Sequence, residues 1–103
     1  MLFGEKKYII EFCQAAVNSF EEYAKHYERY LLTGDETNLR KAGHKIKPVA
    51  QMLKLQSLLE EYEDAKLLLQ TGAEEYLLKE SNDRVQKEIK IVISELKDII
   101  SAQ

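Results

Sequence analysis

The sequence predicts an all-α protein, folded as an up-and-down antiparallel four-helix bundle. Three observations carry this prediction. The composition favours helix-forming residues, only four glycines and one proline interrupt it, and apolar residues recur at steps of three and four along most of the chain. At 103 residues with 45% hydrophobic content, the chain can bury one core but not two. We therefore expect a single domain over residues 1–103.

The first predicted helix is the longest and ends at Thr33-Gly34. Glycine closes helices because it readily adopts the left-handed backbone conformation. Asp35 follows directly, and its carboxylate is expected to cap the second helix by accepting from free backbone amides. The apolar stripe of the first helix consists of Ile9, Phe12, Cys13, Ala16, Phe20, Tyr23, Tyr27, Tyr30 and Leu31.

The remaining chain carries three further amphipathic patterns. The second helix has the stripe Leu39, Ala42, Ile46, Val49 and Leu53, and the third has Leu55, Leu58, Leu59, Tyr62, Ala65 and Leu69 before Thr71-Gly72. Residues 73–82 predict a short helix within EEYLLK and then a polar stop, ESND. The fourth helix carries Val85, Ile89, Val92, Leu96 and Ile99. Helices of this kind with short connections bury their stripes only against one another, which predicts the bundle.

Charge and composition exclude several classes of function. The formal net charge is −3, so neither a nucleic-acid partner nor an anionic membrane partner is expected. No apolar run approaches the ~20 residues of a membrane span, and no stretch shows the charged start, apolar middle and small-residue cleavage site of a secretory signal. Cys13 is the only cysteine and is expected to be a buried, inert thiol. With one cysteine and no signal pattern, we expect a reducing, cytoplasmic setting. We expect no metal site, because the two histidines are not spaced as a metal motif.

The stretch GHKIKPVAQML, residues 43–53, holds the main candidate site. At ~100° per residue, the stripe of the second helix occupies a sector of roughly 80°, and His44 points away from it, toward water. Residues 37–54 contain five basic side chains and no acidic one, whereas residues 55–83 contain eight acidic and two basic. The outward sector holds Arg40, Lys41, Lys47, Pro48 and Gln51, with Lys45, Met52 and Lys54 at its margins.

Two interpretations of His44 stand side by side. An exposed histidine among lysines is often plain solvated surface. Alternatively, an imidazole in water is largely neutral at pH 7, has a nitrogen lone pair available, and is a recognised covalent nucleophile. A phosphoryl group on His44 would bring up to about two negative charges, and Lys47, one helical turn on, lies ~5–6 Å away between Cβ atoms.

The run His44-Lys45-Ile46-Lys47 resembles the core motif of the histidine-containing phosphotransfer (HPt) domain of two-component phosphorelays. It is preceded by GDETNLRKAG and followed, at the tenth residue beyond the histidine, by a helix-ending position, and the resemblance covers nearly the whole chain. It implies that His44 is the phosphorylated histidine and that Lys47 helps to hold the phosphoryl group. The expected protein is then a relay carrier without independent enzymatic turnover.

The resemblance also implies partners. His44 would accept the phosphoryl group from an aspartyl phosphate on a response-regulator receiver domain and pass it to another receiver, with a hybrid sensor histidine kinase as a further partner. The chain itself would need no cofactor, because the catalytic magnesium belongs to the receiver. The residues expected to contact a partner are Arg40, Lys41, Gln51, Met52 and Lys54.

The sequence departs from the family pattern at three positions. Pro48 and Val49 stand where glycine and a small residue often follow the lysine, and Lys54 replaces a frequent glycine. Pro48 removes the amide that would bond to the carbonyl of His44, at a cost of ~3 kcal/mol in a helix interior, so we expect a helix that bends at the histidine but continues. Lys54 prevents the close backbone approach that a glycine would allow.

A second function from a different class fits the same residues. The chain would be a non-catalytic helical interaction module that binds an acidic partner through the basic face around His44. In that case His44→Gln should leave affinity nearly intact, whereas charge reversal at Lys47 or Arg40 should weaken it. His26, on the first helix, is expected to be a rim or surface residue in either case.

Overall fold

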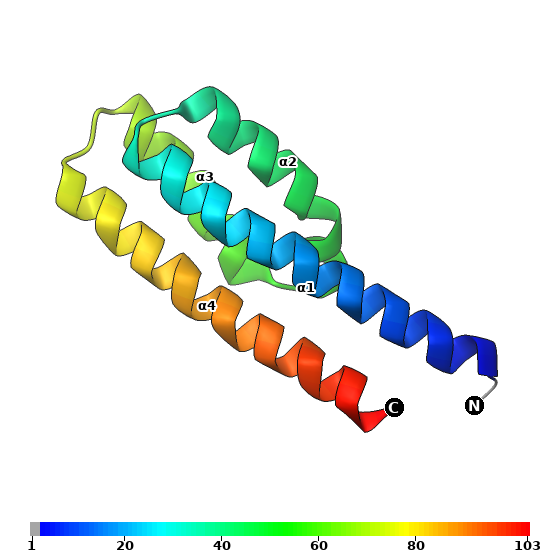
Figure 1. The fold of residues 1–103 in the computed structure, drawn as a ribbon. Coiled ribbons are helices and arrows are strands. Elements are labelled where there is room, and N and C mark those ends of the chain that lie inside the picture. The colour runs from blue at the N-terminus through cyan, green and yellow to red at the C-terminus, as the bar shows by residue number, and fades with distance from the viewer. Residues whose placement is uncertain (1–2) are drawn as a thin grey trace.

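A computed structural model describes residues 3–103, which form four helices and, within that range, no strand. They are α1 (Phe3–Leu32), α2 (Glu36–Met52), α3 (Gln56–Gln70) and α4 (Glu75–Ala102). Each helix contacts its neighbours in the chain, and α4 closes the bundle by packing along α1. Figure 1 shows the long α1 and α4 as one layer and the shorter α2 and α3 as the other. The predicted all-α four-helix bundle is confirmed.

The core runs between the two layers and receives side chains from every helix. Each fully buried leucine, isoleucine or phenylalanine stabilises the fold by ~1.5–3 kcal/mol relative to exposure. Cys13 is buried among them, as expected. None of the described helices has the length and apolarity needed to cross a bilayer. The largest fully buried side chains are Phe20, Tyr27 and Leu31 of α1, Leu39 of α2, Leu58 of α3 and Ile89 of α4.

The turns between helices follow the predicted chemistry. Gly34 has φ 72° and Gly72 has φ 66°, the left-handed conformation that ends α1 and precedes α4. Asp35 caps α2: its carboxylate accepts from the backbone amide of Asn38 at 3.1 Å and from that residue's side-chain amide at 2.7 Å. These hydrogen bonds hold the pKa of the Asp35 carboxyl below its usual range.

The predicted break between residues 73 and 82 is wrong. α4 runs without interruption from Glu75, and both Ser81 and Asn82 are buried inside it. The Ser81 hydroxyl lies 2.7 Å from the hydroxyl of Tyr27, and the Oδ1 atom of the Asn82 side chain accepts from the Gln86 side chain at 3.0 Å. A polar run ends a helix when its side chains need water; here they find partners within the protein.

The buried arc of α2 is wider than the predicted stripe. Val49 and Leu53 are only half-buried, whereas Gly43 and Ala50, outside the stripe, are fully covered. The arc extends toward α3, which packs against this side of α2. α2 continues through Pro48, as predicted. The expected bend at the histidine stays a prediction.

Candidate functional site

His44 and Lys47 lie on the exposed face of α2. Gly43 and Ile46, their neighbours in the chain, are buried and so fix the rotation of the helix that turns both side chains outward. Within residues 3–103, neither His44 nor Lys47 makes a side-chain hydrogen bond or an ion pair. The arrangement is a free imidazole with a free ammonium group one helical turn away.

Gly43 anchors this part of α2 against α3. A Cβ atom at Gly43 would lie 2.6 Å from the hydroxyl oxygen of Tyr62 and closer still to two of its ring carbons. The Tyr62 hydroxyl donates to the carbonyl of Arg40 at 3.3 Å, and Lys66 places its ammonium group 4.7 Å from the centre of the ring. Sequence reasoning missed this contact, although a glycine inside an amphipathic helix, away from any turn, signals a close approach.

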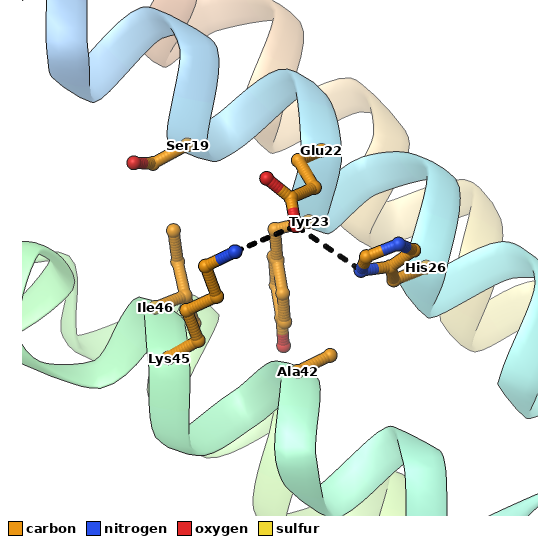
Figure 2. A pocket seen from close by; sticks show the side chains of 7 residues that line it. All are labelled: Ser19, Glu22, Tyr23, His26, Ala42, Lys45 and Ile46. Carbon is orange, nitrogen blue, oxygen red and sulfur yellow. Dashed lines mark hydrogen bonds and ion pairs between the residues drawn. The ribbon is translucent and has the colours of Figure 1, made fainter.

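Glu22 joins α2 to α1 directly beside His44. The ammonium group of Lys45 donates to the Glu22 carboxylate at 2.8 Å, and the Nδ1 atom of His26 lies 3.8 Å from the same oxygen. The hydrogen bond from Lys45 holds the pKa of the Glu22 carboxyl below its usual range, with smaller help from the charges of Lys45 and His26. Figure 2 shows these groups around the phenol of Tyr23. Sequence reasoning did not single out Glu22, because nothing in its local pattern shows which lysine faces it.

The space beneath the Lys45–Glu22 pair is too small for a ligand. Its volume is about 10 Å³, roughly what one water molecule needs. His26 is half-buried at its edge and lies against Tyr30 with a ring separation of 5.3 Å. This surrounding fits the rim position expected for His26.

The residues expected to contact a partner differ in solvent exposure and in whether their charges are paired within the fold. Lys41, Gln51 and Met52 are exposed, Met52 to 65%. Arg40 is half-buried, and its Nε atom donates to the Glu36 carboxylate at 2.8 Å. Two of the five basic side chains in residues 37–54, Arg40 and Lys45, therefore form ion pairs with carboxylates of the fold.

Lys54 occupies an unusual backbone conformation. Its φ is 58°, and it is the only non-glycine residue with positive φ in the part of the chain that the structure describes. The turn that follows α2 requires this angle, since the amide of Lys54 bonds to the carbonyl of Gln51 and the amide of Leu55 to that of Ala50. Glycine adopts this conformation without steric cost, whereas lysine does not.

An open groove runs between α2 and α3 beside Lys47. Its volume is about 320 Å³, with Leu59 and Tyr62 among the residues that line it. On the α3 side of the groove, Lys66 donates to the Glu63 carboxylate, and this hydrogen bond is the main cause of that carboxyl's lowered pKa. Residues 3–103 contain no group of three His, Cys, Asp or Glu side chains arranged to hold a metal ion. The wall on α3 carries Glu60, Glu63 and Asp64, opposite Lys47 and Gln51 on α2.

Comparison with known protein families, with curated proteins and with solved structures found no match to this chain.

Proposed function

We propose that this protein is a phosphorelay intermediate that accepts a phosphoryl group on His44 from a receiver-domain aspartate and passes it to a second receiver. One observation carries the proposal: midway along α2, His44 is exposed and unpaired, with Lys47 free on the same face one turn on. A relay carrier needs a nucleophile that a partner's active site can cover. An exposed histidine on a rigid helix meets that need.

The transfer step is a displacement at phosphorus. A lone pair on an imidazole nitrogen of His44, Nε2 by the HPt resemblance, forms the new N–P bond as the P–O bond to the receiver aspartate breaks. The aspartate leaves as a carboxylate, and the other imidazole nitrogen keeps its proton. Onward transfer reverses the step, with the carboxylate of a second receiver as the attacking group. The receiver supplies the magnesium ion that neutralises charge on the moving group.

Lys47 is the residue of this chain that would stabilise the phosphorylated form. Its ammonium group would meet the new negative charge at about one helical turn's distance. In water such a pair contributes ~0–1 kcal/mol, and more once a receiver covers it and excludes solvent. Lys47 forms no ion pair within residues 3–103, although its charge acts across the groove on Glu63, whose pKa is lowered chiefly by Lys66 and to a smaller degree by Lys47.

The backbone at Lys54 supports the resemblance on which the proposal also rests. The HPt pattern has a frequent glycine at this position, ten residues after the histidine. Here the chain keeps the left-handed turn that favours glycine, with φ 58°, while the residue has become lysine. The turn geometry after α2 therefore agrees with the family pattern at the site where the sequence departs from it.

The test is phosphoryl transfer to the purified protein. We would incubate it with a phosphorylated receiver domain and, separately, with a small phosphoramidate, and locate the modified residue by mass spectrometry at neutral pH. An acid-labile phosphoryl group should appear on the protein and on His26→Gln, and should be absent from His44→Gln. Lys47→Ala should slow transfer by roughly 10-fold, equivalent to ~1.4 kcal/mol, while Lys87→Ala, at an exposed lysine of α4, should change it little.

If no phosphoryl transfer occurs, the second candidate function, a non-catalytic interaction module, takes its place. If neither donor modifies the folded protein, the phosphotransfer proposal is wrong. Binding to an acidic partner that survives His44→Gln but weakens on Lys47→Glu would then assign the face to docking alone. The internal pairing of Arg40 and Lys45 weighs against that function, because each of these two charges already has a carboxylate beside it that an acidic partner would have to compete with.

A further inference from the structure

The ends of α1 and α4 extend beyond the second layer of the bundle. Lys45 of α2 bonds to Glu22 of α1, and α2 ends at Met52, about two turns further on. Ser57, in the first turn of α3, bonds to Glu88 of α4. Among the described residues, no helix of the second layer lies beside the remaining ends, which we call the terminal helix pair: residues 4–14 of α1 and 90–102 of α4 (Figure 1).

The uncovered side of the terminal helix pair is apolar along α1. The helical period places Tyr8 and Phe12 on the side that further along carries Glu22 and His26, which face α2. Tyr8 is 66% exposed and stacks on Phe12 with a ring separation of 6.4 Å. These rings continue the side of α1 that meets α2 elsewhere, but here they meet solvent.

The matching side of α4 is apolar too. Ile91 lies about two turns beyond Arg84, which pairs with Glu61 of α3, and Ile99 lies on the side that carries Ser81, another partner of Glu61. Ile91 is 59% exposed and Ile99 is 42% exposed. Both side chains therefore follow the α3-facing side of α4 past the point where α3 begins.

Carboxylates border this apolar surface on both helices. Glu95 and Asp98 of α4 are exposed and make no ion pair within residues 3–103. Glu11 of α1 approaches Lys7 of its own helix at 3.9 Å, with side chains 63% and 78% exposed. The helical period places Glu5 on this side as well, whereas it turns the lysines of the terminal helix pair to other sides: Lys6, Lys7, Lys90 and Lys97.

The fold itself shows what meets an acidic side chain on these edges. Glu11 lies about three turns before Glu22 on the same edge of α1, and Glu22 receives the ammonium group of Lys45 from α2. Glu95 lies about two turns beyond Glu88, which accepts from the Ser57 hydroxyl of α3. A helix in the place where the second layer is missing would therefore meet Glu11 and Glu95 with the donors that its own side chains supply.

We propose that the terminal helix pair is a docking site for a basic amphipathic helix of a partner protein. That helix lays its apolar side on Tyr8, Phe12 and Ile99 and directs lysine or arginine side chains to Glu11 and Glu95. It thereby supplies the layer that α2 and α3 supply further along. The proposal is independent of phosphotransfer, because His44 lies on the exposed face of α2 and not in the terminal helix pair.

The charges select a basic helix over other occupants. A second copy of this chain would bring its own carboxylates against the same carboxylates, and an acidic helix would be repelled in the same way. A wholly apolar helix would take Glu11 and Glu95 out of water without a partner, which is costly for a charged group. Lysine or arginine side chains pair with both, and the lysines of the terminal helix pair do not face them.

The size of the site sets the strength of the contact. A helix of ~12 residues is ~18 Å long, about the length of the terminal helix pair. One such helix on two others buries less than the ~1,200 Å² of a stable interface. We therefore expect a dissociation constant in the range of ~10 μM to ~1 mM, rising with salt because exposed charge pairs are screened.

Titration of the full chain with a synthetic peptide tests the proposal. The probe has ~14 residues, with leucine at i, i+3, i+4 and i+7 and lysine elsewhere, and its matched peptide has glutamate in place of each lysine. Followed by amide NMR, the lysine peptide should bind within the expected range and shift residues 4–14 and 90–102. The glutamate peptide should not bind.

Paired variants separate the site from the overall field of the protein. Glu11→Lys with Glu95→Lys should weaken binding of the lysine peptide at least ~10-fold, and so should Tyr8→Ser with Ile99→Ser. All four side chains are exposed, so the fold should be retained. Glu60→Lys with Asp64→Lys is the matched control: it makes the same charge change on exposed residues of α3 and should lower affinity less than ~2-fold.

Several outcomes would overturn the proposal. They are a lysine peptide that does not bind at ~1 mM, a glutamate peptide that binds as well, amide shifts centred on α3, and equal losses in the Glu11/Glu95 and Glu60/Asp64 variants. The wild-type protein alone should stay monomeric at the same concentration in sedimentation velocity. A dimer whose formation shifts residues 4–14 and 90–102 would assign the site to a second copy and contradict the proposal.

Discussion

Gly43 and Tyr62 position the helix turn that presents His44. The tyrosine ring occupies the space that any side chain at residue 43 would need, and its hydroxyl is tied to the carbonyl of Arg40. Alanine is preferred over glycine in helices by ~0.5–1 kcal/mol, so helix propensity does not explain a glycine at this position. Close packing of α3 against α2 accounts for it.

Replacing Gly43 with alanine should destabilise the fold. Overpacking costs ~1–3 kcal/mol, and the gain in helix preference offsets ~0.5–1 kcal/mol, so we expect a net loss of ~1–2 kcal/mol in urea unfolding. Gly4→Ala is the control, since nothing lies within 4 Å of a Cβ atom there. In a Tyr62→Leu background the cost of Gly43→Ala should shrink, because the ring is gone. An equal cost in both backgrounds would contradict this account.

At the residue scale, the outward direction of His44 and Lys47 was predictable and the contacts around them were not. Periodicity alone turns His44 away from the buried stripe, and the structure exposes it. The partners of Lys45 and Gly43 lie on α1 and α3, at residues 22 and 62. Local pattern carries no information on such distant partners, so the pairing of a lysine or the space at a glycine becomes visible only in the assembled bundle.

Pro48 removes one backbone hydrogen-bond donor from the interior of α2. The residue is exposed and the helix continues through it, although the amide that would bond to the carbonyl of His44 is missing. Pro48→Ala should restore that bond and raise the free energy of unfolding by ~1–3 kcal/mol, measured by urea denaturation. Hydrogen exchange should show protection of the new amide at residue 48. A variant no more stable than the wild type would mean that the ring costs the helix nothing.

The boundaries of α4 show what an element-scale prediction lacks. Its apolar stripe from Val85 onward was recognised, but ESND resembled a stop because such side chains usually need water or a turn. Ser81 bonds to Tyr27 across 54 residues of sequence, and Asn82 bonds to Glu28 across the same separation. Buried polar partners from α1 replace water. The helix therefore starts five residues before the polar run that was expected to precede it.

Across the whole molecule, titratable groups restrict maximal stability to a middle range of pH. The carboxyls of Glu22, Asp35, Glu36 and Glu63 have pKa values below their usual range because each accepts a hydrogen bond, from Lys45, Asn38, Arg40 and Lys66 respectively. A carboxyl whose pKa is lowered by folding stabilises the folded state above its unfolded pKa of ~4. That stabilisation is lost as the pH falls further.

The alkaline side depends on buried phenols. Burial raises the pKa values of Tyr23 and Tyr27 above the ordinary value, so the folded state holds their protons more tightly than the unfolded chain does. Stability is then full below the unfolded pKa of ~10 and falls as the pH rises beyond it. The thermal unfolding midpoint should accordingly be level between about pH 5 and pH 9 and decline on both sides.

Tyr23→Phe separates the phenol's titration from its packing. The Tyr23 hydroxyl is buried and makes no hydrogen bond within residues 3–103, so its removal should leave stability at pH 7 unchanged or raise it by ~1 kcal/mol. Above pH 10 the same variant should lose less stability than the wild type, because one group that favours unfolding on deprotonation is gone. Tyr76→Phe, on the exposed surface, should reproduce the wild-type curve. If Tyr23→Phe instead destabilises the protein at neutral pH and leaves the alkaline decline intact, then the hydroxyl has a partner in solution and another group governs unfolding at high pH.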